Sequence, residues 1–288
     1  MLGEAAHLSA RYMGEQTGFV LFVGSKNVHM AVRRREDVEK YKEDRYRVAR
    51  EVGYAVFDLL ESMTPQGVSG LLSLLHHLRL TAVFEVLQPT YQHVVNLSHL
   101  SSSQLKFIAF VSAYGDGGQE DSYCDMAPEA GFQVCGRLGV PTVGHTVVSV
   151  ENVDHQMELV RRGHGTEGQV FYFVGKHNTV IGLLKKKTAW YVMARAIREQ
   201  VSNAATSYNK TGNIRDASKL HDRLCAIQTW LGITVEVRDK WIDLGSKFLA
   251  WSMDRLKEGK PCEVRGKFPI LWNEFLQSSD ESDLIPMT

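Results

Sequence analysis

The sequence has few cysteines and prolines, no long hydrophobic run and no net charge. Its 4 cysteines form no Cys-x-x-Cys pair, which excludes a disulfide scaffold and a cysteine-based zinc site. With 44% hydrophobic residues and only 7 prolines, a disordered or collagen-like chain is excluded. Because no apolar run could cross a bilayer and no basic segment leads into an apolar one at the start, we expect an intracellular protein, cytoplasmic or nuclear, without a membrane partner.

Turn residues and short apolar runs divide the first two thirds of the chain into strands and helices. Residues 1–17 show no clear periodicity, whereas residues 33–61, 67–80 and 127–138 have the apolar spacing of helices. The turn at residues 175–178 predicts a hairpin, and residues 115–123 predict a loop. Strands are expected at residues 19–23, 81–87, 106–114, 142–150, 168–174 and 180–184.

The pattern changes near residue 190. Residues 190–205, 216–231 and 240–256 have helical periodicity without the alternation of strands. We therefore expect an α+β protein with two domains, one of residues 1–195 and a smaller, all-helical one of residues 196–288. The chain is expected to act as a monomer.

Three consecutive lysines at the end of the last predicted strand carry the clearest chemical signal. Alternation along a strand sends Lys185 and Lys187 to one face and Lys186 to the other. Glu167 begins the partner strand of the hairpin and could share a cleft with the first two lysines. Such a mixture suits a phosphate and a divalent metal. The alternative is a solvated strand end, because runs of charge usually face water.

With these residues the chain resembles the ATP-dependent RNA ligases of the T4 type, which belong to the covalent nucleotidyltransferase superfamily. The resemblance covers residues 19–195 and consists of individually weak motifs in the family's order. The family has a nucleophilic lysine after the first strand, a Phe-Glu strand, an aromatic residue on a further strand, Glu-Gly-x-Val and a Lys-x-Lys strand. The matching residues here are Lys26, Phe84-Glu85, Phe107 or Phe110, Glu167-Gly168-Gln169-Val170 and Lys185-Lys186-Lys187.

The resemblance implies an antiparallel-sheet adenylation (nucleotidyltransferase) domain that joins RNA 5′-phosphate and 3′-hydroxyl ends. Lys26 would attack the α-phosphate of ATP to give a lysyl-AMP, AMP would pass to the RNA 5′-phosphate, and the 3′-hydroxyl would displace it. Lys185 and Lys187 would bind phosphates, Glu167 would hold Mg²⁺ or Mn²⁺, and Glu85 would bind the ribose. A phenyl ring such as that of Phe110 would stack on adenine, with a place in the core as the alternative, because a phenylalanine in a strand more often belongs to the core. The implied nucleotide-binding residues are Lys26, Asn27, Val28, His29, Glu85, Phe107, Phe110, Glu167, Lys185 and Lys187.

One residue departs from the family pattern, in which the nucleophile motif is Lys-x-x-Gly. Here the motif reads Lys26-Asn27-Val28-His29, so a histidine replaces the glycine. Glycine allows a tight backbone path beside the nucleotide, whereas histidine adopts positive φ only at a cost. His29 could instead donate to a phosphate. The alternative function is therefore a catalytically impaired relative that binds nucleotide or RNA without ligation.

Two further features bear on how the chain would hold RNA. Basic and acidic residues balance at 33 each, so affinity for a polyanion must come from local patches. Arg33, Arg34 and Arg35 form one such patch, with a solvated helix start as the alternative. The predicted helical region carries a mild excess of basic residues ahead of an acidic tail, so we expect it to handle RNA rather than ATP.

Overall fold

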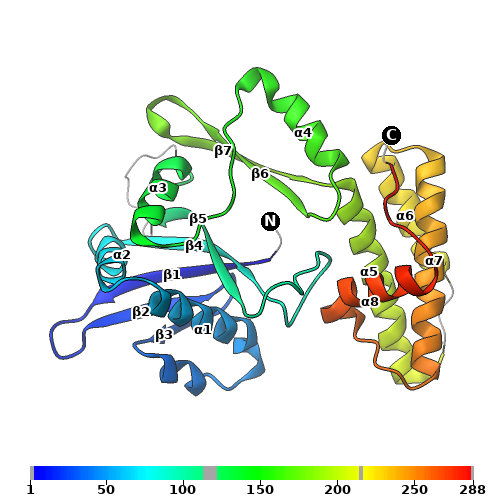
Figure 1. Ribbon diagram of the computed structural model, residues 1–288, viewed down its shortest axis with the longest axis horizontal. Helices are drawn as coiled ribbons and strands as arrows, with labels where there is room; N and C mark the ends of the chain where they lie inside the picture. Colours follow the sequence, from blue (N-terminus) through cyan, green and yellow to red (C-terminus); the bar gives the residue numbers. More distant parts are fainter. Residues whose placement is uncertain (1–2, 113–121, 214–216, 287–288) are drawn as a thin grey trace.

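The computed structural model describes residues 3–112, 122–213 and 217–286 (Figure 1). Its larger sheet has five antiparallel strands in the order β3-β2-β1-β4-β5. The loop expected at residues 115–123 lies almost entirely outside the described residues. The strands of this sheet are β1 (Glu4–Tyr12), β2 (Phe19–Ser25), β3 (His29–Val32), β4 (Leu80–Leu87) and β5 (Gln104–Ser112).

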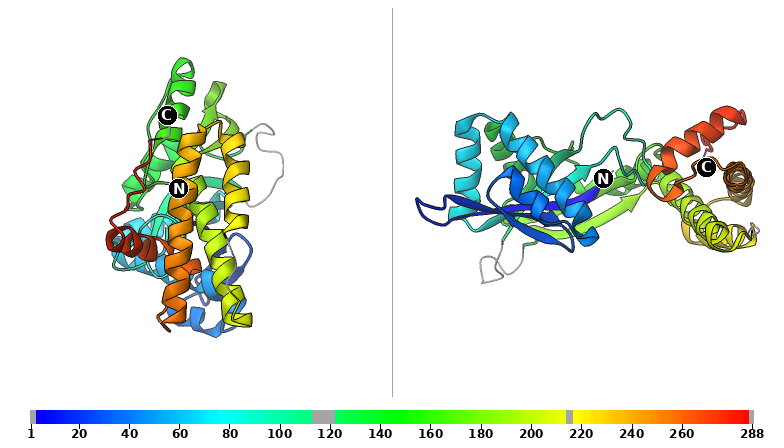
Figure 2. Two further views of the ribbon diagram at one scale, coloured as in Figure 1. Left: turned by 90° about the vertical axis from the view of Figure 1, so that its right-hand side faces the viewer. Right: turned by 90° about the horizontal axis from the view of Figure 1, so that it is seen from below.

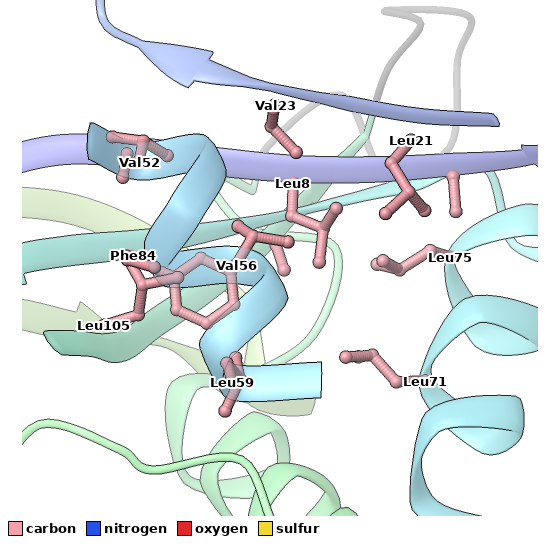
Figure 3. Close-up of a cluster of buried hydrophobic side chains, with 14 of the residues drawn as sticks. Leu8, Leu21, Val23, Val52, Val56, Leu59, Leu71, Leu75, Phe84 and Leu105 are labelled. Carbon is pink, nitrogen blue, oxygen red and sulfur yellow. The ribbon is translucent and has the colours of Figure 1, made fainter. Parts of the chain in front are cut away.

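Helices cover one face of the five-stranded sheet. Those in contact with it are α1 (Arg47–Ser62), α2 (Pro65–His77) and α3 (Pro128–Leu138). Apolar residues recur every two residues in the strands and every three to four residues in the helices. Both sets of apolar side chains therefore point into the layer between the sheet and the helices. Leu8 of β1 and Val56 of α1 are completely buried in that layer (Figure 3).

Strand β1 is the centre of the sheet, although the sequence predicts no element over residues 1–17. It pairs with β2 on one side and with β4 on the other. Its buried residues are Ala6, Leu8 and Ala10, so the two-residue alternation is present. Two of the three are alanines, however, and alanine contrasts little with the small residues on the other face of the strand. The periodicity is therefore hard to recognise in the sequence.

The charged segment between β3 and α1 also differs from the single helix expected over residues 33–61. It forms two short 3₁₀ helices, η1 (Arg35–Lys40) and η2 (Asp44–Tyr46), before α1 begins. Asp37 accepts hydrogen bonds from the backbone amides of Arg33 and Arg34. These bonds fix a tight turn after β3, which prevents a continuous helix from starting there.

A second, two-stranded sheet is formed by β6 (Gly168–Val174) and β7 (Val180–Lys187), joined through η4 (Lys176–Asn178). This confirms the hairpin that the sequence predicts. Helix α4 (Val153–Arg162), preceded by η3 (Val150–Asn152), packs against the hairpin.

The strand expected at residues 142–150 does not form. Thr142 makes an isolated bridge to Phe107, and beyond it Val147 and Val150 are 81% and 82% exposed. An apolar run becomes a strand only where a neighbouring chain offers backbone partners along its length. In the described structure β5 offers such partners only near Phe107, where the Phe107 amide donates to Pro141 and the Val143 amide donates back to Phe107.

Four helices follow the hairpin and form a second core, so the fold has the expected α+β arrangement with the helices last (Figure 2). The first of them begins directly after β7 and continues past residue 195, so the expected domain boundary lies inside a helix. Val94 and Val95, from the segment between β4 and β5, are buried in this second core. In the described residues no helix combines the length and the apolar character that a membrane span needs. The helices are α5 (Ala189–Thr211), α6 (Ser218–Leu231), α7 (Val235–Lys257) and α8 (Val264–Ser278).

Candidate functional site

Lys26 lies in the turn that joins β2 to β3, next to Asn27, and both residues are exposed. The turn closes through a hydrogen bond from the Ser25 amide to the Val28 carbonyl oxygen, 2.9 Å long. Gly24 makes this turn possible, because a Cβ atom there would lie 2.1 Å from the Val28 oxygen. Lys26 has no hydrogen bond or ion pair with the described part of the chain, so its amine is accessible to a ligand.

His29 begins β3 with a negative, extended backbone, so its position does not require glycine. The close backbone approach in this turn occurs at Gly24 instead, and the expected cost of positive φ at His29 is absent. The His29 ring lies against His7 of β1, with Nδ1 of His29 and Nε2 of His7 2.9 Å apart. Burial, and after it the charge of His29, lower the pKa of His7 to about 4. His7 is therefore neutral at pH 7.

Glu85 projects from β4 at the same end of the sheet as the Lys26 turn. The residue is 5% exposed, and its Oε1 accepts a hydrogen bond from the Gly3 amide at 2.7 Å. Ala6 of β1 pairs with Ser25 on one side and with Phe84 on the other, and these two residues are the chain neighbours of Lys26 and Glu85. Since neighbouring strands lie about 4.8 Å apart, the backbones of Ser25 and Phe84 are about 10 Å apart, and Lys26 and Glu85 follow directly after them in the chain. That spacing suits two side chains that hold different parts of one nucleotide.

Phe107 and Phe110 of β5 are both completely buried, with ring centroids 4.5 Å apart. They belong to the core beneath α3, where a Cβ atom on Gly131 would lie 3.2 Å from the Phe107 ring. Neither ring offers a face to a ligand, which corrects the expectation that one of them stacks on adenine. A β-bulge between Val83 and Phe84 of β4 shifts the pairing with β5, so simple alternation does not predict the direction of these rings.

Glu167, Lys185 and Lys187 form an ion-pair cluster at the end of the β6–β7 hairpin. Oε1 of Glu167 lies 2.6 Å from the Lys185 ammonium and 3.3 Å from the Lys187 ammonium. Glu167 is 8% exposed, whereas the lysine side chains are 37% and 27% exposed. Lys186, which pairs with Gln169, alternates to the opposite face, as strand geometry predicts. The cluster therefore presents two partly open cations on a buried carboxylate.

The backbone around Glu167 is tightly fixed. Gly168 has φ of +139°, and a Cβ atom there would lie 2.0 Å from the Lys186 carbonyl oxygen, so only glycine fits this crossing. The Thr188 amide donates to the Glu167 carbonyl oxygen at 3.0 Å, and the Thr188 hydroxyl donates to Thr166 at 2.8 Å. Two neighbouring chain segments thus hold the acid and the lysines in register.

The lysine strand is also tied to α5. The Lys187 ammonium lies 4.9 Å from the centre of the Tyr191 ring, within reach of a cation–π contact. Burial, followed by the charge of Glu167, raises the pKa of Tyr191 to about 12, so its hydroxyl stays protonated. The start of the helical region therefore forms one wall of the cluster.

Asp283 is a residue that sequence reasoning does not find. Its Oδ2 accepts hydrogen bonds from the indole N–H groups of Trp190 in α5, at 2.8 Å, and Trp272 in α8, at 2.9 Å. Its Oδ1 lies 3.2 Å from Nε2 of His164, three residues before Glu167. In the sequence Asp283 is one acid of an acidic tail, and no local pattern distinguishes it from its neighbours.

The structure thus assembles two groups of the expected site residues. One comprises Lys26, His29 and Glu85 at one end of the larger sheet, and the other comprises Glu167 with Lys185 and Lys187 on the hairpin. Among the described residues there is no cluster of three or more His, Cys, Asp or Glu side chains suited to a metal ion. Comparison of the chain with protein-family models and with curated proteins gives no match.

Proposed function

We propose that the chain is an ATP-dependent RNA ligase, a nucleotidyltransferase that joins 5′-phosphate and 3′-hydroxyl RNA ends through a lysyl-AMP. The observation that carries the proposal is the convergence of Lys185 and Lys187 on the buried carboxylate of Glu167. Ammonium groups that are already held together can stabilise charge on a transferring phosphate without further reorganisation. The ordered resemblance to RNA ligases supports the same reaction.

Lys26 is the nucleophile of the proposed reaction. Its amine forms a bond to the α-phosphorus of ATP as the bond to pyrophosphate breaks. An oxygen of the RNA 5′-phosphate then attacks the same phosphorus and releases the lysine, and the 3′-hydroxyl of the second end attacks the RNA phosphate and releases AMP. Lys26 is exposed in the turn, so the bound nucleotide has to exclude water from around the amine during the attack.

The remaining residues bind and orient the nucleotide. Glu85 accepts hydrogen bonds from ribose hydroxyls, and Lys185 and Lys187 contact phosphate oxygens. Glu167 is the one carboxylate of its cluster, which fits Mg²⁺ or Mn²⁺, since Mg²⁺ takes one or two carboxylates and completes its shell with phosphate and water. The ion would neutralise charge on the phosphates.

Mass spectrometry of the intact chain after incubation with ATP and Mg²⁺ tests the proposal. We expect a mass gain of one adenylate, located on Lys26 by peptide mapping and absent from Lys26→Ala. Lys42→Ala is the matched control, because Lys42 is an exposed lysine without a partner in the described chain. An adduct that persists in Lys26→Ala contradicts the assignment of the nucleophile.

The same experiment separates the ligase from a catalytically impaired relative. A wild-type chain that binds ATP in equilibrium dialysis but gains no adenylate supports the impaired relative, for which the motif histidine would be the cause. His29→Gly then restores the adduct if the histidine blocks the reaction. The extended backbone at His29 and its contact with His7 argue that the histidine fits this turn without distortion.

A further inference from the structure

The face of the five-stranded sheet opposite α1 and α2 continues from the Lys26 turn along β2 and β3. Strand alternation turns Leu21 into the core and leaves Phe22 on the opposite face, where the residue is 39% exposed. Ala31 of β3 pairs with Phe22, and His29 lies on the same face two residues earlier. An exposed aromatic ring therefore lies next to the candidate nucleotide site on the same face of the sheet.

At the other end of β3 the surface is hollowed into a shallow groove of about 380 Å³, lined in part by Arg33, Arg34 and Lys40. Asp37 also lines it and is fully engaged, accepting from Lys40 Nζ at 2.6 Å and from the amides of Arg33 and Arg34 at 2.9 and 3.2 Å. The hydrogen bond from Lys40 has the largest effect, and together these bonds hold the pKa of Asp37 well below its usual range. Asp37 is therefore ionised at neutral pH. Three cations and one anion leave the groove with a net positive charge.

The guanidinium groups of Arg33 and Arg34 are available to a ligand. The Arg33 side chain has no ion pair or hydrogen bond within the described residues, and that of Arg34 lies 3.7 Å from the exposed carboxylate of Glu36. Arg35, by contrast, pairs with Asp58 of α1 at 2.5 Å. The run of three arginines thus divides into one structural residue and two that can bind phosphate oxygens through paired hydrogen bonds.

We propose that Phe22 and the groove formed by Arg33, Arg34 and Lys40 bind a single-stranded segment of the RNA, with phosphates in the groove and a base on Phe22. The identity of the strand rests on the proposed ligase function. A positively charged groove beside an exposed aromatic ring is the combination that holds single-stranded nucleic acid without sequence preference.

The length of β3 fits such a segment. His29 and Arg33 are four residues apart, which corresponds to about 13 Å along a strand. A stacked nucleic-acid strand advances about 3.4 Å per nucleotide, so about four nucleotides cover that length. An RNA end held at Lys26 would therefore bring a phosphate several nucleotides away into the groove.

Fluorescence anisotropy with a labelled, 5′-phosphorylated single-stranded RNA and the ATP-free full chain tests the groove over a range of salt concentrations. Each phosphate contact of a single strand contributes about 0.7 to the slope of log affinity against log salt. Arg33→Gln/Arg34→Gln should reduce the slope by about 1.4 and the affinity at physiological salt about tenfold. The charge-matched control is Lys42→Gln/Arg45→Gln, two exposed residues outside the groove, which should bind as wild type. Equal slopes and affinities in the two double variants overturn the proposal.

Phe22→Ala tests the stacking contact separately. It should lower the affinity about tenfold without changing the salt slope, because a base–aromatic contact involves no counterion. Unchanged affinity removes Phe22 from the proposed site. Lysyl-AMP formation, which should persist in all these variants, reports an intact fold. If the variants form lysyl-AMP normally and bind RNA as the wild type does, the proposal for the groove is rejected and the ligase proposal stands. If the wild-type chain forms no lysyl-AMP but its RNA binding depends on the groove, the ligase proposal is rejected and the groove stands.

Discussion

Replacing Asp283 with alanine should destabilise the protein strongly, because hydrogen bonds from three separate segments meet on that carboxylate. Trp190 follows β7, Trp272 belongs to α8, and His164 precedes Glu167. The two tryptophans are only 6% and 2% exposed, so water cannot readily take the place of the lost acceptor.

The magnitude follows from the groups that the substitution leaves unpaired. A buried donor without a partner costs about 1–3 kcal/mol, so the two indole N–H groups of Trp190 and Trp272 together cost about 2–6 kcal/mol in Asp283→Ala. Asp283→Asn keeps an oxygen that can accept from both indoles and loses only the charge, so we expect a cost of about 1 kcal/mol. At about 2 °C per kcal/mol for a chain of this size, the melting temperature should fall by about 4–12 °C for alanine and about 2 °C for asparagine.

Thermal and urea unfolding, followed by tryptophan fluorescence, measures these differences, since two of the reporters contact the mutated residue. Glu281→Ala is the control, because Glu281 lies in the same tail but pairs at the surface with Lys247, and such pairs contribute about 1 kcal/mol or less. If Asp283→Asn destabilises the chain as much as Asp283→Ala, charge rather than hydrogen bonding holds the tail, which would refute the role given to the hydrogen bonds. Equal stability of Asp283→Ala and Glu281→Ala would also refute it.

The remaining predictions concern the two groups of site residues. Lys187→Ala should slow lysyl-AMP formation about 10²- to 10³-fold in single-turnover assays, which is the effect of losing one charge-stabilising donor. Lys186→Ala should keep a rate near that of the wild type, because the Lys186 side chain lies on the other face of the strand. Gly168→Ala should destabilise the hairpin by at least about 1–3 kcal/mol in urea unfolding, because its φ of +139° and the crossing strand both oppose a Cβ atom. Since the pKa of His7 is about 4 in the folded chain and 6.5 in the unfolded one, the unfolded state binds more protons between these values. Stability should therefore fall as pH decreases from 6.5 to 4, and His7→Gln should flatten that dependence in pH-resolved unfolding curves.

Local patterns in the sequence predict the hairpin and its lysines well. The phase of Lys185, Lys186 and Lys187 follows from the two-residue period of a strand, and the structure has that phase with Glu167 on the expected side. A strand period is a property of the strand itself, so it can be read without knowledge of the neighbours. The direction of the Phe110 ring cannot be read in this way, because the bulge in the pairing of β4 with β5 depends on both strands.

Features that depend on contacts between distant segments could not be predicted, because a local pattern does not show which neighbours a segment has. Residues 142–150 have the composition of a strand, yet whether they form one depends on a partner that β5 supplies only at its Phe107 position. The Asp283 contacts join positions 93 and 11 residues distant along the chain for Trp190 and Trp272. Asp283 lies beyond the end of α8 at Ser278, so no helical period relates it to Trp272, and only the packing of the tail on the helices brings these groups together.

Helix α5 contributes both to the candidate site, through Tyr191, and to the second core. The helix begins two residues after Lys187, and the remaining helices cover its buried face. Ending the chain near residue 205 would expose side chains such as Met193 and Ile197, both completely buried, at about 1.5–3 kcal/mol each. Loss of activity in such a truncated chain would therefore report unfolding rather than a missing RNA contact. Substitution of exposed charges in the full chain separates these two effects, because it leaves both cores packed.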